Sequence, residues 1–485
     1  MKLNTISNKS GLYSKILLFA VIILLNGLLN CKVSNVIVTI PQILFVLFLL
    51  SKKDIPSAIF YHVLFFITSF GYLGSVDSLG NEVANLESFN YAKLRISVAP
   101  VFILISFLII FISINSKYTI SKEAKKTDFY YLFCFFKYIM ISGSVMMLIG
   151  FAFLNYYVEG VMYYGIYALY VFVIAYMLLI VYKHGVHDRI FEILPHILII
   201  GIIISTCSKF VSIAVVGSLV ISYYGVLLLP MMMYGKNSLI SLLVFCLFVY
   251  GSIMTSMGGK VIIEIVLVFI ATFMLSFTSD IESHYPQRSK LAKILFVIVI
   301  LSLPTLMIYI EYVATASDRS NFIHKLHSVQ TMWDFMWGKN SIYEVDDSPQ
   351  TRIAEFANIM YENVTNPIYM LFGRGFGGYY HDTLGIMGGL DLANGTYTES
   401  AIAKGEFYYA HDAFVSVPFM SGLIGVYMWI KCIVKYLKHA SLNYYKLAVI
   451  PFLALIFFFD TQIGATGVVI LFASESNLIK NKKYE

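Results

Sequence analysis

Long apolar runs alternate with short polar connections along most of this chain. Runs of about 18 or more residues recur, and this is the length that an α-helix needs to cross the hydrocarbon core of a bilayer. The expected spans are 13–30, 34–50, 56–75, 94–115, 129–152, 158–182, 192–206, 209–231, 239–256, 260–278, 292–312, 412–431, 446–459 and 461–476. The short segments near 192 and 461 can tilt or re-enter. The pattern predicts an all-α polytopic membrane protein with about 14 transmembrane helices, in the range 12–14.

Composition supports this class and excludes others. Of the 485 residues, 59% are hydrophobic and 13% are charged, and the mean hydropathy is +0.78. A soluble domain of this length does not need so much apolar surface. The strands of a membrane β-barrel are far shorter than these runs and alternate apolar with polar residues, so a barrel is excluded. The five cysteines fall mostly in apolar segments and form no CxxC pair, which argues against a disulfide framework.

Charge divides the chain into three parts. A polar loop at 314–410 holds six Lys/Arg and eleven Asp/Glu, a net charge of −5, whereas the whole chain carries +6. The lysines and arginines of the remainder cluster in alternate short connections, starting with Lys2, Lys9 and Lys15, and such clusters mark the cytoplasmic side. We therefore expect spans 1–11 in 1–313, a large extracytoplasmic loop at 314–410, and spans 12–14 with a cytoplasmic tail in 411–485.

Two short helices are expected inside the loop. Apolar residues from Phe322 to Met336 repeat at helical spacing after Ser320. Ser348 can cap a second helix with Pro349 at its first position, and Asn366-Pro367 ends it.

Two arginines of the loop are candidates for binding a diphosphate. Arg352 falls in the first turn of the second predicted helix, where a cation opposes the helix dipole but helps to bind an anion. Arg374 lies in GRGFGG (Gly373–Gly378), whose glycines let the backbone approach a ligand and offer N–H groups to anions. The alternatives are a surface ion pair between Arg352 and Glu355 and an ordinary glycine-rich turn around Arg374.

A third candidate lies where the loop re-enters the membrane, within GEFYYAHDAF. His411 can act there as a base or hold an acceptor hydroxyl, and Glu406 and Asp412 are near it in sequence. Tyr408 and Tyr409 can stack on sugar rings. The alternatives are a structural histidine and an interfacial belt of tyrosines. The sequence holds no HxxxH or HExxH pattern, so no metal is expected.

Two lysines begin apolar spans that enter from the outer side. Lys209 follows STCS and Lys260 follows TSMGG. Both can clamp a lipid diphosphate next to the acidic loop. The alternative is snorkelling of a long cationic side chain at the membrane surface.

These features together resemble the bacterial O-antigen polymerase and O-antigen ligase superfamily, polytopic glycosyltransferases of the GT-C type. The resemblance rests on the large outer loop before the last spans and on the basic starts of inward spans. It also rests on two motifs, TRIAEFANIMYENVTNPIYMLFGRGFGG (Thr351–Gly378) and the residues His411, Asp412, Phe414, Gly422 and Gly425. Where the family often has Ser-Arg at an inward span, this chain has lysine, which keeps the charge but loses the bidentate fork.

The resemblance implies a reaction and roles for the residues. Glycan would leave an undecaprenyl diphosphate carrier on the outer face of the bacterial plasma membrane, without a cofactor. Arg352, helped by Arg374, Lys209 and Lys260, would stabilise the diphosphate. His411 would activate the acceptor hydroxyl, and the acceptor glycan would contact Glu406, Asp412, Tyr408 and Tyr409.

Three functions are compatible with this pattern. The first is polymerisation of lipid-linked repeat units into O-antigen or capsular polysaccharide. The second is an O-antigen ligase that transfers polymer to the lipid A core. The third is a flippase for lipid-linked oligosaccharides, although transporters usually show repeated halves and broken spans at mid-membrane. The expected partners are the lipid-linked donor and acceptor and membrane lipid, with a polysaccharide chain-length regulator left open and no nucleic acid.

Overall fold

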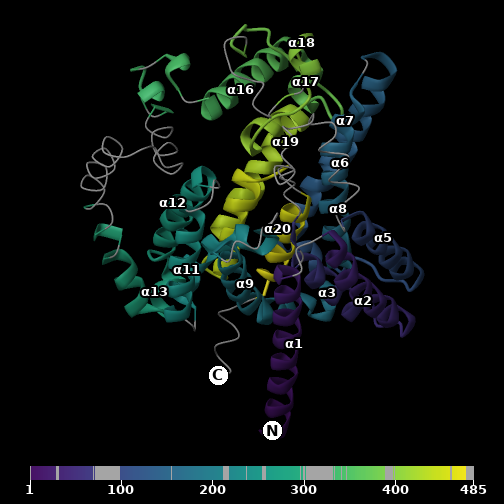
Figure 1. Cartoon of the computed structure of the whole chain (residues 1–485), viewed down its shortest axis with the longest axis vertical. Helices are drawn as coiled ribbons and strands as arrows, with labels where there is room; N and C mark the ends of the chain where they lie inside the picture. Colours follow the sequence, from purple (N-terminus) through teal and green to yellow (C-terminus); the bar gives the residue numbers. More distant parts are fainter. Residues whose placement is uncertain are drawn as a thin grey trace.

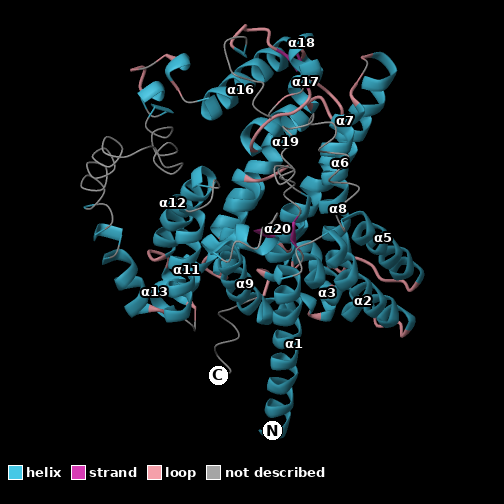
Figure 2. Ribbon diagram, in the orientation of Figure 1, coloured by secondary structure: helices cyan, strands magenta, loops and turns pink. Residues whose placement is uncertain are grey.

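The chain is built almost entirely of helices (Figure 2). The computed structural model describes residues 2–28, 32–68, 70–71, 99–154, 156–210, 218–235, 238–253, 258–294, 296–298, 301, 331–332, 334–339, 341–345, 347–387, 397, 399–458 and 461–476. The β-structure within these residues is two short antiparallel pairs. Strand β1 (Phe70–Gly71) pairs with β2 (Ser218–Leu219), and β3 (Tyr380–His381) pairs with β4 (Glu406–Phe407). The predicted all-α class is confirmed.

Four of the described helices are long and apolar enough to cross a bilayer. They are α6 (Asp128–Phe153), the continuous helix of α7 (Val158–Gly160), η3 (Val161–Gly165) and α8 (Ile166–Ile180), α9 (Val186–Phe210), and α19 (Ala413–Lys438). Further apolar helices are α1 (Lys2–Leu28), α2 (Lys32–Ser51), α3 (Ile55–Ile67), α5 (Ala99–Asn115), η5 (Val220–Leu227) with α10 (Leu228–Tyr234), α11 (Ser238–Ile253), α12 (Gly258–Leu275), η8 (Tyr444–Ala448) with η9 (Ile450–Leu455), and α20 (Thr461–Ala473). Such a set is typical of a multi-pass membrane protein.

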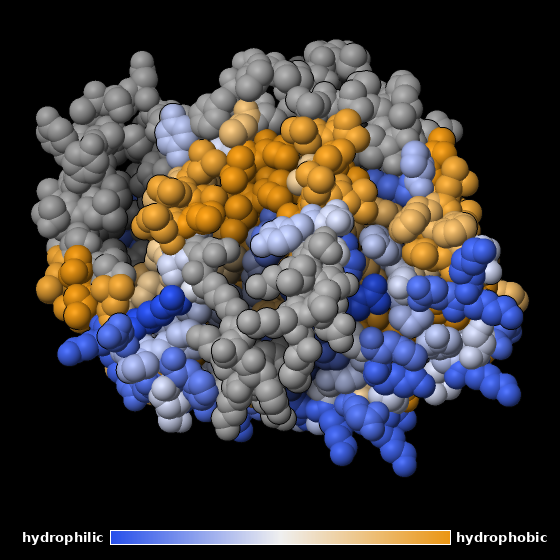
Figure 3. Space-filling view, turned by 90° about the horizontal axis from the view of Figure 1, so that it is seen from below, coloured by the Kyte–Doolittle hydropathy of each residue, from blue (hydrophilic) through white to orange (hydrophobic). Residues whose placement is uncertain are grey.

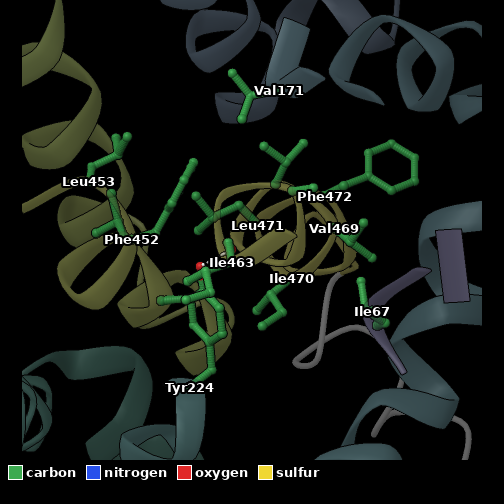
Figure 4. Close-up of a cluster of buried hydrophobic side chains, with 14 of the residues drawn as sticks. Ile67, Val171, Tyr224, Phe452, Leu453, Ile463, Val469, Ile470, Leu471 and Phe472 are labelled. Atoms are coloured by element: carbon green, nitrogen blue, oxygen red, sulfur yellow. Dashed lines mark hydrogen bonds between the residues drawn. The ribbon is translucent and has the colours of Figure 1, made fainter. Parts of the chain in front are cut away.

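Helix α20 lies at the centre of the molecule, and every side chain from Ile463 to Ser474 is buried. It packs against α3, α8, α9, η5 and η8. The Tyr224 hydroxyl of η5 donates to the Ile463 carbonyl at 2.8 Å, as Figure 4 shows among the surrounding apolar side chains. A helix that is hydrophobic all round needs such an enclosed position.

The basic connections gather at one end of the molecule. Their mutual contacts are Arg189 to Ser57, the Tyr118 ring to the His184 ring, His439 and Lys446 to Asp128, and Ser441 to Asp280. These contacts join the connections that follow α2, α5, α8, α12 and α19 into one group, hereafter the basic end. Figure 3 views the molecule from the side of the N-terminus and shows hydrophilic side chains over the lower part of this face, with an apolar band above them. The charge pattern predicts that alternate connections lie on the same side of the membrane, and this grouping agrees with that prediction.

The described part of the polar loop lies at the opposite end (Figure 1). Helix α6 begins at the basic end, and the connection that follows it meets the loop, because the Tyr157 N–H donates to the Gly377 carbonyl at 2.9 Å. The loop carries α16 (Asp347–Thr365), α17 (Pro367–Phe372) and α18 (Glu399–Lys404). Further short helices are η2 (Ala124–Lys126), η4 (Tyr182–His184), α13 (Ser279–His284) and η6 (Ile342–Glu344).

Several predicted boundaries are wrong. Helix α9 continues through the predicted turn at 207–208 to Phe210, so Lys209 lies in the last turn of a helix instead of beginning one. Helix α3 stops at Ile67, well before 75, and the chain pairs as β1 shortly afterwards. Most of the predicted span at 292–312, and most of the loop helix predicted after Ser320, lie outside the described residues. The second loop helix is confirmed as α16, and it ends just before Asn366 as predicted. Its start differs, because it begins at Asp347, so Ser348 lies inside the helix and does not cap it.

A buried ion pair at the basic end provides a test of this packing. Lys446 Nζ lies 2.7 Å from Asp128 Oδ2 and 3.2 Å from Glu475 Oε1. Lys446→Met leaves both carboxylates without this cation, and we expect it to cost about 3 kcal/mol of stability. The control Lys339→Met, which removes an exposed pair with Asp334, should cost less than about 1 kcal/mol. Thermal unfolding in detergent measures both, and equal midpoints would contradict the assignment.

Candidate active site

Two neighbouring acid–base pairs join α16 to the start of α19. Arg352 and Glu355 lie three residues apart and therefore on one face of α16. The Arg352 guanidinium forms an ion pair with Asp412, and the Glu355 carboxylate pairs with His411 at 2.5 Å from Nδ1. The adjacent residues His411 and Asp412 thus both contact the same face of α16. The predicted alternative, a surface pair of Arg352 with Glu355, is not what forms.

Arg352 is not in the first turn of its helix. Because α16 begins at Asp347, Arg352 is its sixth residue and lies in the second turn. The helix N-terminus therefore adds little to its anion affinity, since that effect fades within the first turn. The Asp412 carboxylate instead fixes the direction of the planar guanidinium, which is half-buried.

Glu355 is fully buried and accepts three hydrogen bonds. The donors are the backbone N–H of His411 at 2.9 Å, its Nδ1, and the hydroxyl of Tyr397. Burial and the adjacent Glu355 carboxylate raise the pKa of the Tyr397 hydroxyl well above its ordinary value, so this group stays protonated and donates. A carboxylate facing Nδ1 assigns the ring proton to that nitrogen, which leaves the lone pair on Nε2.

Asp412 has an unusual backbone conformation. Its φ is 58° and its ψ 157°, a region that costs a non-glycine residue of the order of 1–3 kcal/mol. Its carbonyl accepts the Ser416 N–H at 2.9 Å in the first turn of α19, while its side chain pairs with Arg352. Contacts on both sides hold the strained residue between His411 and the helix.

Tyrosines at the start of an apolar helix contact the residues just before His411. The Tyr164 hydroxyl lies 2.8 Å from the Ala410 nitrogen and 3.2 Å from its carbonyl oxygen, so it fixes the backbone before His411. The Tyr409 ring stands edge-on to His411 with centroids 4.7 Å apart. Burial raises the pKa of Tyr409 to about 12, and its hydroxyl accepts from Tyr163 at 3.2 Å. Two tyrosines of the η3 turn thus hold the site against the helical core.

The glycine-rich run has a structural task that the sequence did not suggest. Helix α19 has a kink at Gly422, which has φ 58° and ψ −164°. Donors from outside the helix reach the four carbonyls just before this break. They are Asn363 Nδ2 to the Pro418 carbonyl at 3.4 Å, the Arg374 N–H to Phe419 at 2.8 Å, the Gly375 N–H to Met420 at 3.2 Å, and the Tyr138 hydroxyl to Ser421 at 3.1 Å.

The close approach of these two chain segments requires glycine at both contact points. A Cβ on Gly373 would lie 2.4 Å from the backbone of Met420 and Ser421, and one on Gly422 would lie 2.5 Å from the carbonyl carbon of Leu371. Both glycines also have positive φ, at 71° and 58°.

Arg374 and the N–H groups near it are used inside the protein. The N–H groups of Arg374, Gly375 and Phe376 donate to carbonyls of α19 and α6, so they are not offered to an anion as predicted. Arg374 is 3% exposed, and its guanidinium lies 2.6 Å from Glu362 Oε2 and donates to the Tyr379 carbonyl at 2.7 Å. This geometry favours a structural role for Arg374.

The four predicted glycan-contacting residues divide into two groups. Asp412 and Tyr409 adjoin His411, as described above. Glu406 accepts instead from the Tyr157 hydroxyl, and the Tyr408 ring packs against Tyr157 with centroids 5.4 Å apart. The sequence neighbourhood of His411 therefore does not identify its carboxylate, because its partner is Glu355 and not Glu406.

The two lysines predicted to bind the diphosphate lie near the ends of membrane helices. Lys209 is the penultimate residue of α9 and Lys260 the third of α12, but their side chains lie outside the described part of the chain. Their diphosphate role stays a prediction. No group of three or more His, Cys, Asp or Glu side chains that could hold a metal occurs among the described residues.

The sequence identifies Glu355 and Tyr397 but not their roles. Glu355 is expected there only as a surface partner of Arg352, although its spacing from Arg352 already puts both on one helix face. Tyr397 is expected only among the loop tyrosines that could stack on sugar rings, and it donates instead to Glu355.

Comparison with known protein families, curated proteins and solved structures finds no match for this chain. The resemblance drawn from the sequence therefore rests on the residues quoted for it.

The glycine contacts yield a prediction with an internal control. Gly373, Gly422 and Gly385 all have positive φ, but a Cβ on Gly385 would meet nothing within 4 Å. Gly385→Ala should cost only the backbone strain, about 1–2 kcal/mol. Gly373→Ala and Gly422→Ala add a clash with backbone atoms and should lower the unfolding midpoint clearly further. Equal midpoints for the three variants would show that the glycine run does not seat in the break of α19.

Proposed function

We propose that the chain polymerises polyprenyl-diphosphate-linked repeat units into O-antigen or capsular polysaccharide, as a GT-C-like glycosyltransferase. The observation that carries the proposal is the pairing of Arg352 with Asp412 beside that of His411 with Glu355. These residues stand on α16 and at the start of α19, at the end of the molecule opposite the basic connections. An arginine and a carboxylate-supported histidine side by side suit displacement of an anionic leaving group by a hydroxyl.

The depth of the site also supports a lipid-borne substrate. Tyr164, which contacts Ala410, lies six residues after Val158 at the start of its membrane helix, a rise of about 9 Å. The site therefore stands near the outer boundary of the apolar layer. A diphosphate at the headgroup level of the outer leaflet can reach it while the polyprenyl chain stays in lipid.

The proposed reaction exchanges one bond for another. The acceptor hydroxyl oxygen forms a bond to the anomeric carbon of the donor glycan, and the bond from that carbon to the diphosphate oxygen breaks. The electron pair leaves with the polyprenyl diphosphate, whose developing charge the Arg352 guanidinium stabilises. Asp412 keeps the guanidinium in a fixed direction, so little reorganisation is needed.

His411 is the proposed base in this step. Its Nε2 takes the proton of the acceptor hydroxyl as the new bond forms. Glu355 holds Nδ1 and stabilises the imidazolium that results, and Tyr397 keeps the carboxylate in place. Glu355 and Tyr397 act here as positioning residues, because they act through His411.

The first test is the surface-glycan ladder of a deletion strain complemented with variants at matched membrane levels. Arg352→Ala and His411→Ala should give a single-repeat band. The controls Lys339→Ala and His381→Ala change exposed residues of the same loop and should restore the ladder. Polymer that accumulates off its anchor in the deletion strain would indicate a ligase, and lipid-linked units retained in the cytoplasm would indicate a flippase. A full ladder with either active-site variant would remove that residue from the mechanism.

The second test separates positioning from binding with a double-mutant cycle. Glu355→Gln should lower kcat by about 10²-fold or more, because general base catalysis supplies about 10²–10⁴-fold. The KM for the lipid-linked donor should change little. Combined with His411→Ala, the Glu355 change should cause no further loss, since the two act as a unit. If the fold-reduction in kcat of the double variant equals the product of the two single reductions, Glu355 acts independently of His411.

A further inference from the structure

The second half of α16 and the whole of α17 expose apolar side chains where a polar loop would expose polar ones. Val364 is 66% and Ile368 57% exposed, and Tyr361, Leu371 and Phe372 are exposed as well. Single exposed apolar residues are normal on a protein surface, but a contiguous row of them on two successive helices indicates a surface that contacts another apolar phase or molecule.

Apart from the exposed Thr365, the polar residues of the same segment point inward. Asn358 and Asn363 are buried, and their side chains bond to Asp382 and to the Pro418 carbonyl. Glu362 pairs with the buried Arg374. The segment is thus polar toward the protein and apolar toward the outside. This arrangement is the reverse of a water-facing helix and typical of a surface that meets hydrocarbon.

The exposed row continues onto the membrane face of α19. Below the break at Gly422, α19 exposes Leu423, Tyr427, Ile430 and Val434 at spacings of three and four residues, which form one stripe. The position of a Cβ on Gly422 meets the Leu371 carbonyl, so the end of α17 adjoins the top of this stripe.

The depth of α17 can be measured along α6. The Phe376 N–H donates to the Gly143 carbonyl at 3.3 Å, and Gly143 lies ten residues before the end of α6 at Phe153, a distance of about 15 Å. Along that stretch α6 exposes Val145, Leu148 and Phe153, all apolar. The chain just after α17 therefore runs beside a stretch of α6 that presents an apolar surface, and its next residue, Gly377, meets Tyr157 just before α7.

We propose that α17 and the second half of α16 lie in the outer leaflet of the bilayer, with lipid acyl chains covering Val364, Ile368, Leu371 and Phe372. The inference needs the multi-pass architecture but not the polymerase activity. It carries a consequence for that activity. Phe356 and Phe414, whose exposed rings lie 6.2 Å apart, continue the apolar face to within four residues of Arg352 and two of Asp412. A lipid-linked diphosphate would then reach Arg352 sideways from the membrane.

The test is cysteine labelling of the full-length protein in nanodiscs of pure phosphatidylcholine, where both membrane faces are open to a water-soluble maleimide. The probe variants are Val364→Cys and Ile368→Cys. Thr383→Cys, an exposed loop position, is the water-facing reference, and Ile430→Cys on the α19 stripe is the lipid-facing reference. The unaltered protein gives the background of the native cysteines, and labelling in SDS shows that each new thiol is reactive.

We expect loss of labelling at 364 and 368, as at 430, together with full labelling at 383. Labelling of both probe variants at the rate of 383 would overturn the proposal, and so would protection that is seen in native membranes but lost in nanodiscs, because it would point to a covering protein. Neither result depends on glycan transfer, so failure here and failure of the polymerase proposal are separable. A variant that elutes differently from the wild-type protein in size-exclusion chromatography is replaced by Leu371→Cys. Protection of this cysteine from the maleimide would support the proposal, and labelling at the rate of position 383 would overturn it.

Discussion

The break of α19 at Gly422 is the constraint on which the arrangement of this site depends. A kink inside an apolar layer weakens the helical hydrogen bonds of the carbonyls before it, and water cannot replace them there. The chain resolves this by inserting the residues after α17 against the break, so that two backbone N–H groups, an asparagine and a tyrosine meet the four carbonyls. A structure that must satisfy these four groups has little freedom in where it places α16 and α17.

The candidate active site follows from that placement. Once α17 is seated on α19, α16 presents the face that carries Arg352 and Glu355 to the residues just before α19. His411 and Asp412 are fixed from the other side by Tyr164 and by the first turn of α19. Strain at Asp412 is tolerated because both its neighbours are held. The same seating places the apolar side of α17 beside the lipid-facing stripe of α19, so one packing contact determines both the site and the surface around it.

The sequence predicted the helices well where a single physical rule decides. Apolar length located most spans, Asn366-Pro367 located the end of α16, and the lysine clusters predicted which connections share a side. The end of α9 was misjudged because the polar residues around Cys207 were taken for a turn. Arg352 and His411 could be named from residue type and position, but their partners could not. Glu355 bonds to a residue 56 positions away, and the donors to the α19 carbonyls come from α6, α16 and the glycine run, so no local pattern encodes these contacts.

The most direct measurement is turnover by the purified full-length protein in liposomes with one synthetic polyprenyl-diphosphate-linked repeat unit. Products would be separated by chain length, and released polyprenyl diphosphate would be counted. The account predicts that wild-type protein elongates the glycan and releases one polyprenyl diphosphate for each linkage formed, and that His411→Ala protein does neither. Intact repeat units after incubation with well-folded wild-type protein, or equal release by the His411→Ala variant, would contradict it.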